Sequence, residues 1–289
     1  MATPTISHSQ IMVAGTDEEE AYRFDSNIAP DTIRAIGSSS NRIKSVVRAA
    51  QKKDNEAAAY IVFTNVPPSV IEISEDNRHV IGGKNIRIFY DESLQQLIVK
   101  LVAGPHEVAG AQLDRIFSSK FESMGLGQEI VATGRKRIKE SPHSKEPDRS
   151  WKPLALPPAR STKWPTLVVE CGWSESLNRL HLDAKWWLTH SHGDVGVVVL
   201  VGVGRTEPEI TIEIWIIDPN PKSPCPVSSQ AVTISRGQQN AIITFDAPLV
   251  IEFEKIFLRP AISPQEHDIT ICQQELEFLA TVTWEEAGI

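Results

Sequence analysis

Two acidic residues, Asp148 and Glu170, stand where carboxylates could do chemistry. Asp148 follows a proline in "KEPDRSW", and Glu170 follows the apolar run "TLVV" in "TLVVECGW". A continuous apolar run is typical of a strand that is covered on both faces, and a carboxylate at its end is costly to bury unless a positive group meets it. Glu170 therefore indicates a site. Asp148 alone is explained equally well as a turn residue after a proline.

Metal binding is the chemistry that this pair of carboxylates best supports. Two strands joined by a loop of this length can pair side by side and bring Asp148 and Glu170 together. Oxygen ligands suit Mg²⁺, which keeps several waters and takes one or two carboxylates. A metal held in this way activates water and neutralises charge on a phosphate. We therefore expect the two residues to share Mg²⁺, with Mn²⁺ as the alternative ion.

A basic stretch leads into Asp148. It comprises Arg135, Lys136, Arg137, Lys139, Lys145 and Arg149. Such a run is usually a solvated loop, but beside a phosphodiester site it can hold the phosphate backbone of a nucleic acid. The net charge of the whole chain is -8, which argues against a protein that coats nucleic acid over its entire surface.

The elements expected to position these residues form an α/β core. The sequence predicts a hairpin, a helix, a short strand, a buried strand, a second helix and two further strands, at 85–104, 105–127, 128–134, 166–173, 175–191, 194–203 and 209–218. This order describes a mixed central sheet flanked by helices. Trp186 falls opposite the apolar face of the second helix. We expect the terminal extensions, or a second copy of the chain in a homodimer, to cover it.

The chain is expected to divide into a core and two extensions. Residues 1–24 form a flexible tail, 25–83 an N-terminal extension, 84–218 the core, and 219–289 a C-terminal β/α extension. Both extensions are expected to pack on the core, because the apolar C-terminal segments are too short to build a core of their own.

The cellular setting is expected to be intracellular, either cytoplasmic or nuclear, without membrane association. Three cysteines without paired metal spacing indicate a reducing compartment. The first residues lack the pattern of a signal peptide, and no apolar run is long enough to cross a bilayer.

Several motifs together resemble a known family. "PD" at 147–148 and "VVEC" at 168–171 resemble the PD-(D/E)XK restriction-endonuclease-like superfamily. "GPHE", "MGL", "KEPDRSW", "WPTLVVECGWSESL" and "DAKWWLTHSHGDV" resemble an uncharacterised restriction-endonuclease-like family common in fungi, over roughly residues 84–205. The resemblance implies a nuclease-like core and Mg²⁺-dependent cleavage of nucleic acid. Asp148, Glu170 and the Cys171 carbonyl would hold the metal.

The resemblance also has one departure. The superfamily places a lysine two residues after the strand acid, where this chain has Gly172. In related bacterial proteins this lysine moves to the next helix, where Lys185 stands, so the resemblance implies a catalytic role for Lys185. A solvated flank explains Lys185 equally well. The missing lysine and the acidic net charge favour an alternative, a decayed nuclease fold that binds protein or nucleic acid.

Glu107 is the remaining candidate ligand. It opens the helix at 105–127, where a carboxylate suits the positive end of the helix dipole. In the superfamily an acid on the first core helix often contacts the metal, so the resemblance implies the same for Glu107. Its neighbour His106 could act on a water or a phosphate, but a lone histidine is more often a structural group.

Overall fold

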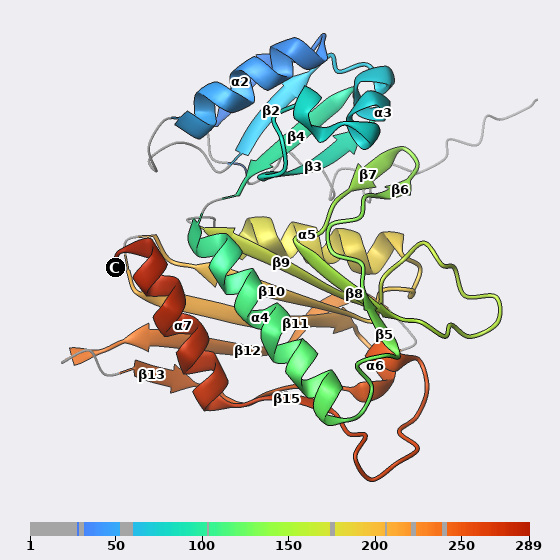
Figure 1. Ribbon diagram of the computed structural model, residues 1–289, viewed down its shortest axis with the longest axis vertical. Coiled ribbons are helices and arrows are strands. Elements are labelled where there is room, and N and C mark those ends of the chain that lie inside the picture. Colours follow the sequence, from blue (N-terminus) through green and yellow to red (C-terminus); the bar gives the residue numbers. More distant parts are fainter. Residues whose placement is uncertain are drawn as a thin grey trace, which may run out of the picture.

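The computed structural model describes residues 28, 32–52, 60–102, 104–173, 177–205, 207–220, 224–238 and 242–289. The expected tail at 1–24 lies outside these ranges. The chain is an α/β protein with mixed sheets flanked by helices, as the sequence predicts (Figure 1). Within the described residues, no helix combines the length and apolar composition needed to cross a bilayer.

The first sheet has six strands and contains the N-terminal part of the chain. In spatial order they are β1 (Ile33–Ile36), β2 (Tyr60–Thr64), β4 (Gln96–Leu101), β3 (Ile86–Asp91), β7 (His143–Lys145) and β6 (Ile138–Glu140). Its outer face is covered by α2 (Ser40–Lys52), α3 (Pro68–Asp76) and the short helix η1 (Arg78–Val80). The β3–β4 hairpin, expected at the start of the core, pairs through β4 with β2 and thus belongs to this sheet.

The second sheet has seven strands and holds both candidate carboxylates near one end. Its order is β13 (Ile242–Phe245), β12 (Pro226–Arg236), β11 (Glu209–Ile217), β10 (Val197–Val203), β9 (Leu167–Trp173), β8 (Arg149–Pro153) and β5 (Ile130–Ala132). β9 and β10 are parallel, and the other neighbours are antiparallel. A small third sheet pairs β14 (Leu249–Ile251) with β15 (Ile269–Ile271).

Helices cover both faces of the second sheet. α4 (Gly104–Ser123) and α7 (Gln273–Ala287) cover one face, and the short α6 (Phe253–Phe257) packs into the same core. α5 (Leu177–His190) covers the other face and lies between the two sheets (Figure 1). The C-terminal segment therefore shares its core with α4, because β12 joins the sheet and Leu279 and Trp284 of α7 are fully buried in that core.

The alternation of side chains along the first sheet explains how it faces α5. Successive residues of a strand point to opposite faces. In β2, Ile61 and Phe63 pack with α2 and α3, whereas Tyr60 and Val62 pack with the α5 side. On the same side, Phe89 of β3 lies edge-on to Trp186, which is 0% exposed. Trp186 is thus covered within the chain by Phe89, which belongs to the predicted core, in a cluster that also holds Val62 of the N-terminal extension.

Candidate functional site

Asp148 and Glu170 lie at adjoining positions of two paired strands. β8 and β9 are antiparallel with Arg149 opposite Val169, so Asp148, just before β8, reaches the end of β9 that carries Glu170. The backbone N–H of Cys171 donates to Asp148 Oδ2 at 3.0 Å. Asp148 and Glu170 are both 1% exposed. The pairing inferred from the loop length thus brings the two acids to one buried region.

Asp148 is surrounded by positive and hydrogen-bonding groups. Arg87 Nε lies 3.0 Å from Oδ1, and Lys100 Nζ donates to Oδ2 at 3.0 Å. His106 Nε2 lies 2.9 Å from the same Oδ2. Burial alone would raise the pKa of Asp148, but these neighbours outweigh it and hold that pKa well below the usual range. Asp148 is therefore an ionised carboxylate.

His106 is neutral in this setting. Burial lowers the pKa of His106, as do the nearby Lys100 and Arg87, and the attraction of Asp148 does not offset them. The pKa of Asp148 is lowered by His106 first, then by Lys100 and Arg87, against the effect of burial.

Glu170 has a different set of partners. Trp187 Nε1 of α5 donates to Glu170 Oε1 at 2.7 Å, and Lys145 Nζ of β7 lies 3.2 Å from the same oxygen. Burial raises the pKa of Glu170 to about 7, and the attraction of Lys145 does not cancel this effect. One reason is that Lys145 also donates to Asp183.

Asp183 completes a buried chain of alternating charges. Besides Lys145, it has Arg179 Nη2 at 3.6 Å, one helical turn earlier on α5. Burial would raise the pKa of Asp183, but Lys145 and Arg179 lower it overall. The full network comprises Arg87, Asp148, Lys100, Glu170, Lys145, Asp183 and Arg179, each 5% exposed or less. A cavity of about 20 Å³ lies among them, which is room for roughly one water molecule.

The ligands expected for a metal are engaged by protein groups. Lys100 Nζ donates both to Asp148 Oδ2 and to the Cys171 carbonyl oxygen, and Glu170 is held by Trp187 and Lys145. These residues, as arranged, do not fit a divalent ion.

A second donor set sits at the same place. Ligand atoms of His106, Asp148 and Cys171 lie within 4.8 Å of one another. Burial raises the pKa of the Cys171 thiol. Arg87 Nε and Lys100 Nζ each lie 3.0 Å from an oxygen of Asp148, so both carboxylate oxygens already have a cationic partner. This set therefore does not fit a metal either.

The structure gives Glu107 partners of its own and places Lys185 on α5. Glu107, in the first turn of α4, accepts from Arg87 Nη2 at 2.9 Å and Arg149 Nη2 at 2.8 Å. Burial opposes, but these hydrogen bonds prevail and lower the pKa of Glu107. Lys185 is half-buried on α5 and forms no ion pair with Glu170 or Asp148; the lysines that do so are Lys145 and Lys100. A role for Lys185 stays a prediction.

Sequence reasoning missed Arg87 and Lys100, although a signal was present. Both are single charges within apolar strands, "IRIF" and "LIVKL". That is the same feature that singled out Glu170, because a charge inside a buried strand requires a partner. Lys145 stood out only as part of the basic stretch, but it is 5% exposed and belongs to the buried network.

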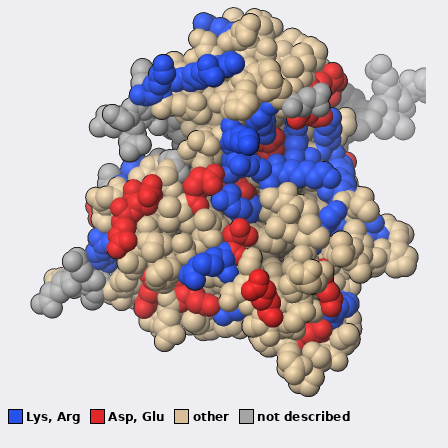
Figure 2. Space-filling model, viewed as in Figure 1, with Lys and Arg blue, Asp and Glu red and all other residues tan. Residues whose placement is uncertain are grey.

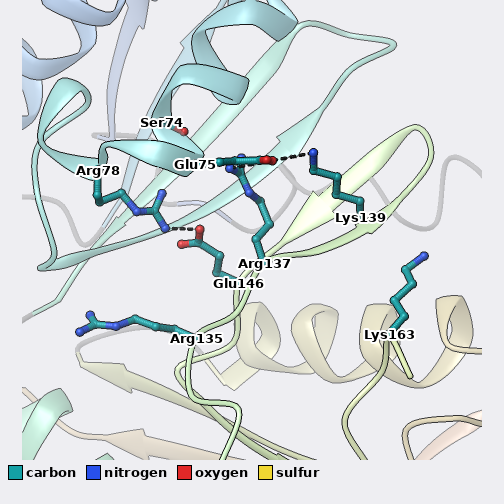
Figure 3. Close-up of a pocket in the computed structure, with 8 residues that line it drawn as sticks. All are labelled: Ser74, Glu75, Arg78, Arg135, Arg137, Lys139, Glu146 and Lys163. Carbon is teal, nitrogen blue, oxygen red and sulfur yellow. Dashed lines mark hydrogen bonds and ion pairs between the residues drawn. The ribbon is translucent and has the colours of Figure 1, made fainter. Parts of the chain in front are cut away.

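Three other residues of the basic stretch line an open pocket. A cavity of about 470 Å³ lies between α3, η1 and the segment that leads into β6 and β7 (Figure 3). It is lined by Ser74, Glu75, Arg78, Arg135, Arg137, Lys139, Glu146 and Lys163. The predicted residues Arg135, Arg137 and Lys139 are thus brought together, whereas Lys136 is exposed and is not part of the lining.

The pocket carries an excess of positive charge. Five of its residues are basic and two are acidic. Arg78 pairs with Glu146, and both Arg137 and Lys139 pair with Glu75. Figure 2 shows Lys and Arg side chains gathered between the two sheets, on a protein whose lower part mixes both signs. We refer to this site as the basic pocket.

Comparisons with known proteins give weak structural likenesses and no family. No family model matches the chain, and no curated protein matches it. Among solved structures, the chain is similar to a protein of Anabaena variabilis ATCC 29413 described as a "putative nuclease belonging to DUF820". The TM-score is 0.38 at 14% identity, over 67% of this chain and 90% of the other. A TM-score of this size carries no functional argument.

Proposed function

We propose that this protein binds nucleic acid through the phosphate backbone, using the basic pocket of a nuclease-like α/β fold. The observation that supports the proposal is the grouping of five basic side chains against two acidic ones in a cavity of about 470 Å³. Because the net charge of the chain is -8, this local excess is what would draw a polyanion to one face.

The residue types suit phosphate. Arg78, Arg135 and Arg137 present guanidinium groups, whose planar donors match phosphate oxygens in pairs. The Lys139 side chain is 63% exposed, so it can follow a backbone that runs past the pocket. Two of the arginines are held by Glu146 and Glu75, which limits the side-chain freedom that is given up on binding.

Base recognition is not part of the proposal. The described residues that line the basic pocket include no aromatic side chain, and phosphate recognition positions a protein without reading sequence. We therefore expect binding with little sequence preference and strong salt dependence. The expected Mg²⁺-dependent cleavage would use the Asp148 region. Oxygen atoms of that region already accept hydrogen bonds from Lys100, so the proposed function is binding without cleavage.

The proposal is tested by fluorescence polarisation with labelled single-stranded and duplex DNA and RNA over a salt series. The triple variant Arg135→Gln/Lys139→Gln/Lys163→Gln should weaken binding roughly tenfold or more. It should also flatten the salt slope by about one for each phosphate that the variant no longer neutralises. All three line the pocket, Arg135 and Lys139 as exposed residues and Lys163 as a half-buried one, and none belongs to the buried network.

A matched control removes the same charge elsewhere. Arg115→Gln/Lys120→Gln/Lys255→Gln alters α4 and α6, on the second-sheet side of the molecule. We expect it to retain most of the affinity. Equal losses of affinity in the two triple variants would mean that only net charge matters, and no measurable binding by the unmodified protein at low salt would refute the proposed function.

A further inference from the structure

We infer that the Lys100 ammonium holds the place of the divalent cation in the Asp148 region, so that this protein's nuclease-like core is complete without a metal. Lys100 Nζ donates to Asp148 Oδ2 and to the Cys171 carbonyl. Asp148 and the Cys171 carbonyl are two of the four groups that the sequence resemblance marks as metal ligands. Glu170 is the third and Glu107 the fourth. A cation supplied by the chain itself therefore takes up the ligands that an ion from solution would need.

The balance of buried charges points the same way. The network holds four basic side chains, Arg87, Lys100, Lys145 and Arg179, and three carboxylates, Asp148, Glu170 and Asp183. Glu146, which is 3% exposed and lines the same cavity, is a fourth buried carboxylate, so the buried cations and carboxylates balance without an added ion. A divalent ion would add two more positive charges to a region from which water is excluded, where unpaired charge is costly.

The third expected ligand is also committed. Glu170 Oε1 accepts from Trp187 Nε1 at 2.7 Å and lies 3.2 Å from Lys145 Nζ. Trp187 is 0% exposed, so its indole N–H has no route to water if Glu170 turns toward a metal. Losing that partner would leave a buried donor unsatisfied. Glu170 thus has partners within the chain and needs no ion to satisfy it.

Lys100 comes from the first sheet, which indicates a role for the N-terminal part of the chain. Lys100 is on β4 and Lys145 on β7, both in the first sheet, whereas Asp148 and Glu170 belong to the second. The face of the first sheet toward α5 carries both lysines into the region. The first sheet is therefore a fixed source of counter-charge for the acids of the second.

The inference is tested with the full chain and Mn²⁺ alone, by electron paramagnetic resonance titration and by the shift in Tm. The unmodified protein and Glu170→Gln should give the same Mn²⁺ titration, because no Mn²⁺ binds at Glu170. Stoichiometric Mn²⁺ binding that disappears in Glu170→Gln would overturn the inference.

A gain of function provides the second arm. Lys100→Met keeps the apolar stem of the side chain and removes its charge. The folded variant should therefore acquire Mn²⁺ binding and a Tm that rises with Mn²⁺. The control Lys84→Met, at an exposed position, should show neither change. Adding Asp148→Asn to Lys100→Met should remove the gain. A folded Lys100→Met that ignores Mn²⁺ would contradict the inference, and if this variant does not fold, the titration of the unmodified protein decides.

Discussion

Arg87 and Lys100 lie directly opposite each other on β3 and β4. Like charges at paired positions of antiparallel strands repel each other, and both side chains are buried. Asp148 offsets this repulsion. Its Oδ1 lies 3.0 Å from Arg87 Nε and its Oδ2 lies 3.0 Å from Lys100 Nζ. The carboxylate at the start of β8 is thus the counter-charge that allows β3 and β4 to pair, and it joins the two sheets.

Asp148→Asn should therefore be strongly destabilising. The amide keeps the shape but removes the charge between Arg87 and Lys100, and breaking a buried ion pair costs about 3–5 kcal/mol. Urea unfolding followed by circular dichroism measures the change. Asp218→Asn, at a half-buried strand end, serves as a control and should change stability by less than about 0.5 kcal/mol. Equal effects at the two positions would show that Asp148 does not join the sheets.

Lys145 and Lys185 should respond differently to the same replacement. Lys145→Met leaves Glu170 and Asp183 without their shared cation and should cost about 3–5 kcal/mol. Lys185→Met should stay within about 0.5 kcal/mol, because Lys185 is not part of the buried network. Both are measured as free energies of unfolding in urea. A larger loss of stability for Lys185→Met than for Lys145→Met would indicate that Lys185, and not Lys145, is the partner of Glu170.

Glu170 should give the protein a recognisable pH dependence. Its pKa is raised from 4.5 to about 7, first by burial, then by the charges of Asp183 and Asp148, against the attraction of Lys145 and Lys100. The folded state therefore binds the proton more tightly than the unfolded state. This contribution to stability is full below about pH 4.5 and is lost as the pH rises through about 7.

Glu170→Gln removes that dependence while keeping an acceptor for Trp187. Relative to the variant, the unmodified protein should lose about 3 kcal/mol of stability between pH 4.5 and pH 8, at roughly 1.4 kcal/mol per unit of pKa difference. Chemical denaturation at several pH values gives this difference, in which the other titrating groups cancel. Parallel stability curves for the two proteins would show that burial does not raise this pKa.

The C-terminal segment should not separate from the core. Trp284 of α7 is 0% exposed and packs in the same core as α4, so Trp284→Ala should cost about 3–5 kcal/mol. Phe278, on the same helix but 49% exposed, gives a matched control with a much smaller loss of stability. Limited proteolysis should release no stable fragment from residues 220–289, and the isolation of a folded one would contradict the shared core.

The sequence by itself determined the local elements and pointed to the buried acids. The hairpin at β3–β4, the long helix α4, the strand of Glu170 and the helix α5 are all readable from patterns of two or 3.6 residues, because such patterns depend only on neighbours along the chain. Glu170 stood out for the same reason, as one charge at the end of an apolar run. The basic stretch was visible too, since it is contiguous.

Only the tertiary structure decided which cations meet those acids. Lys100 is 48 residues before Asp148 and 71 before Cys171, and it reaches them because β4 pairs with β2 and β3 in a sheet that faces α5. Strand partners are chosen by packing between distant segments, which no local pattern contains. The sequence therefore pointed to Lys185, the nearest lysine in a family motif, as the cation beside these acids. That Lys100 and Lys145 meet them instead follows from the way the two sheets pack across α5.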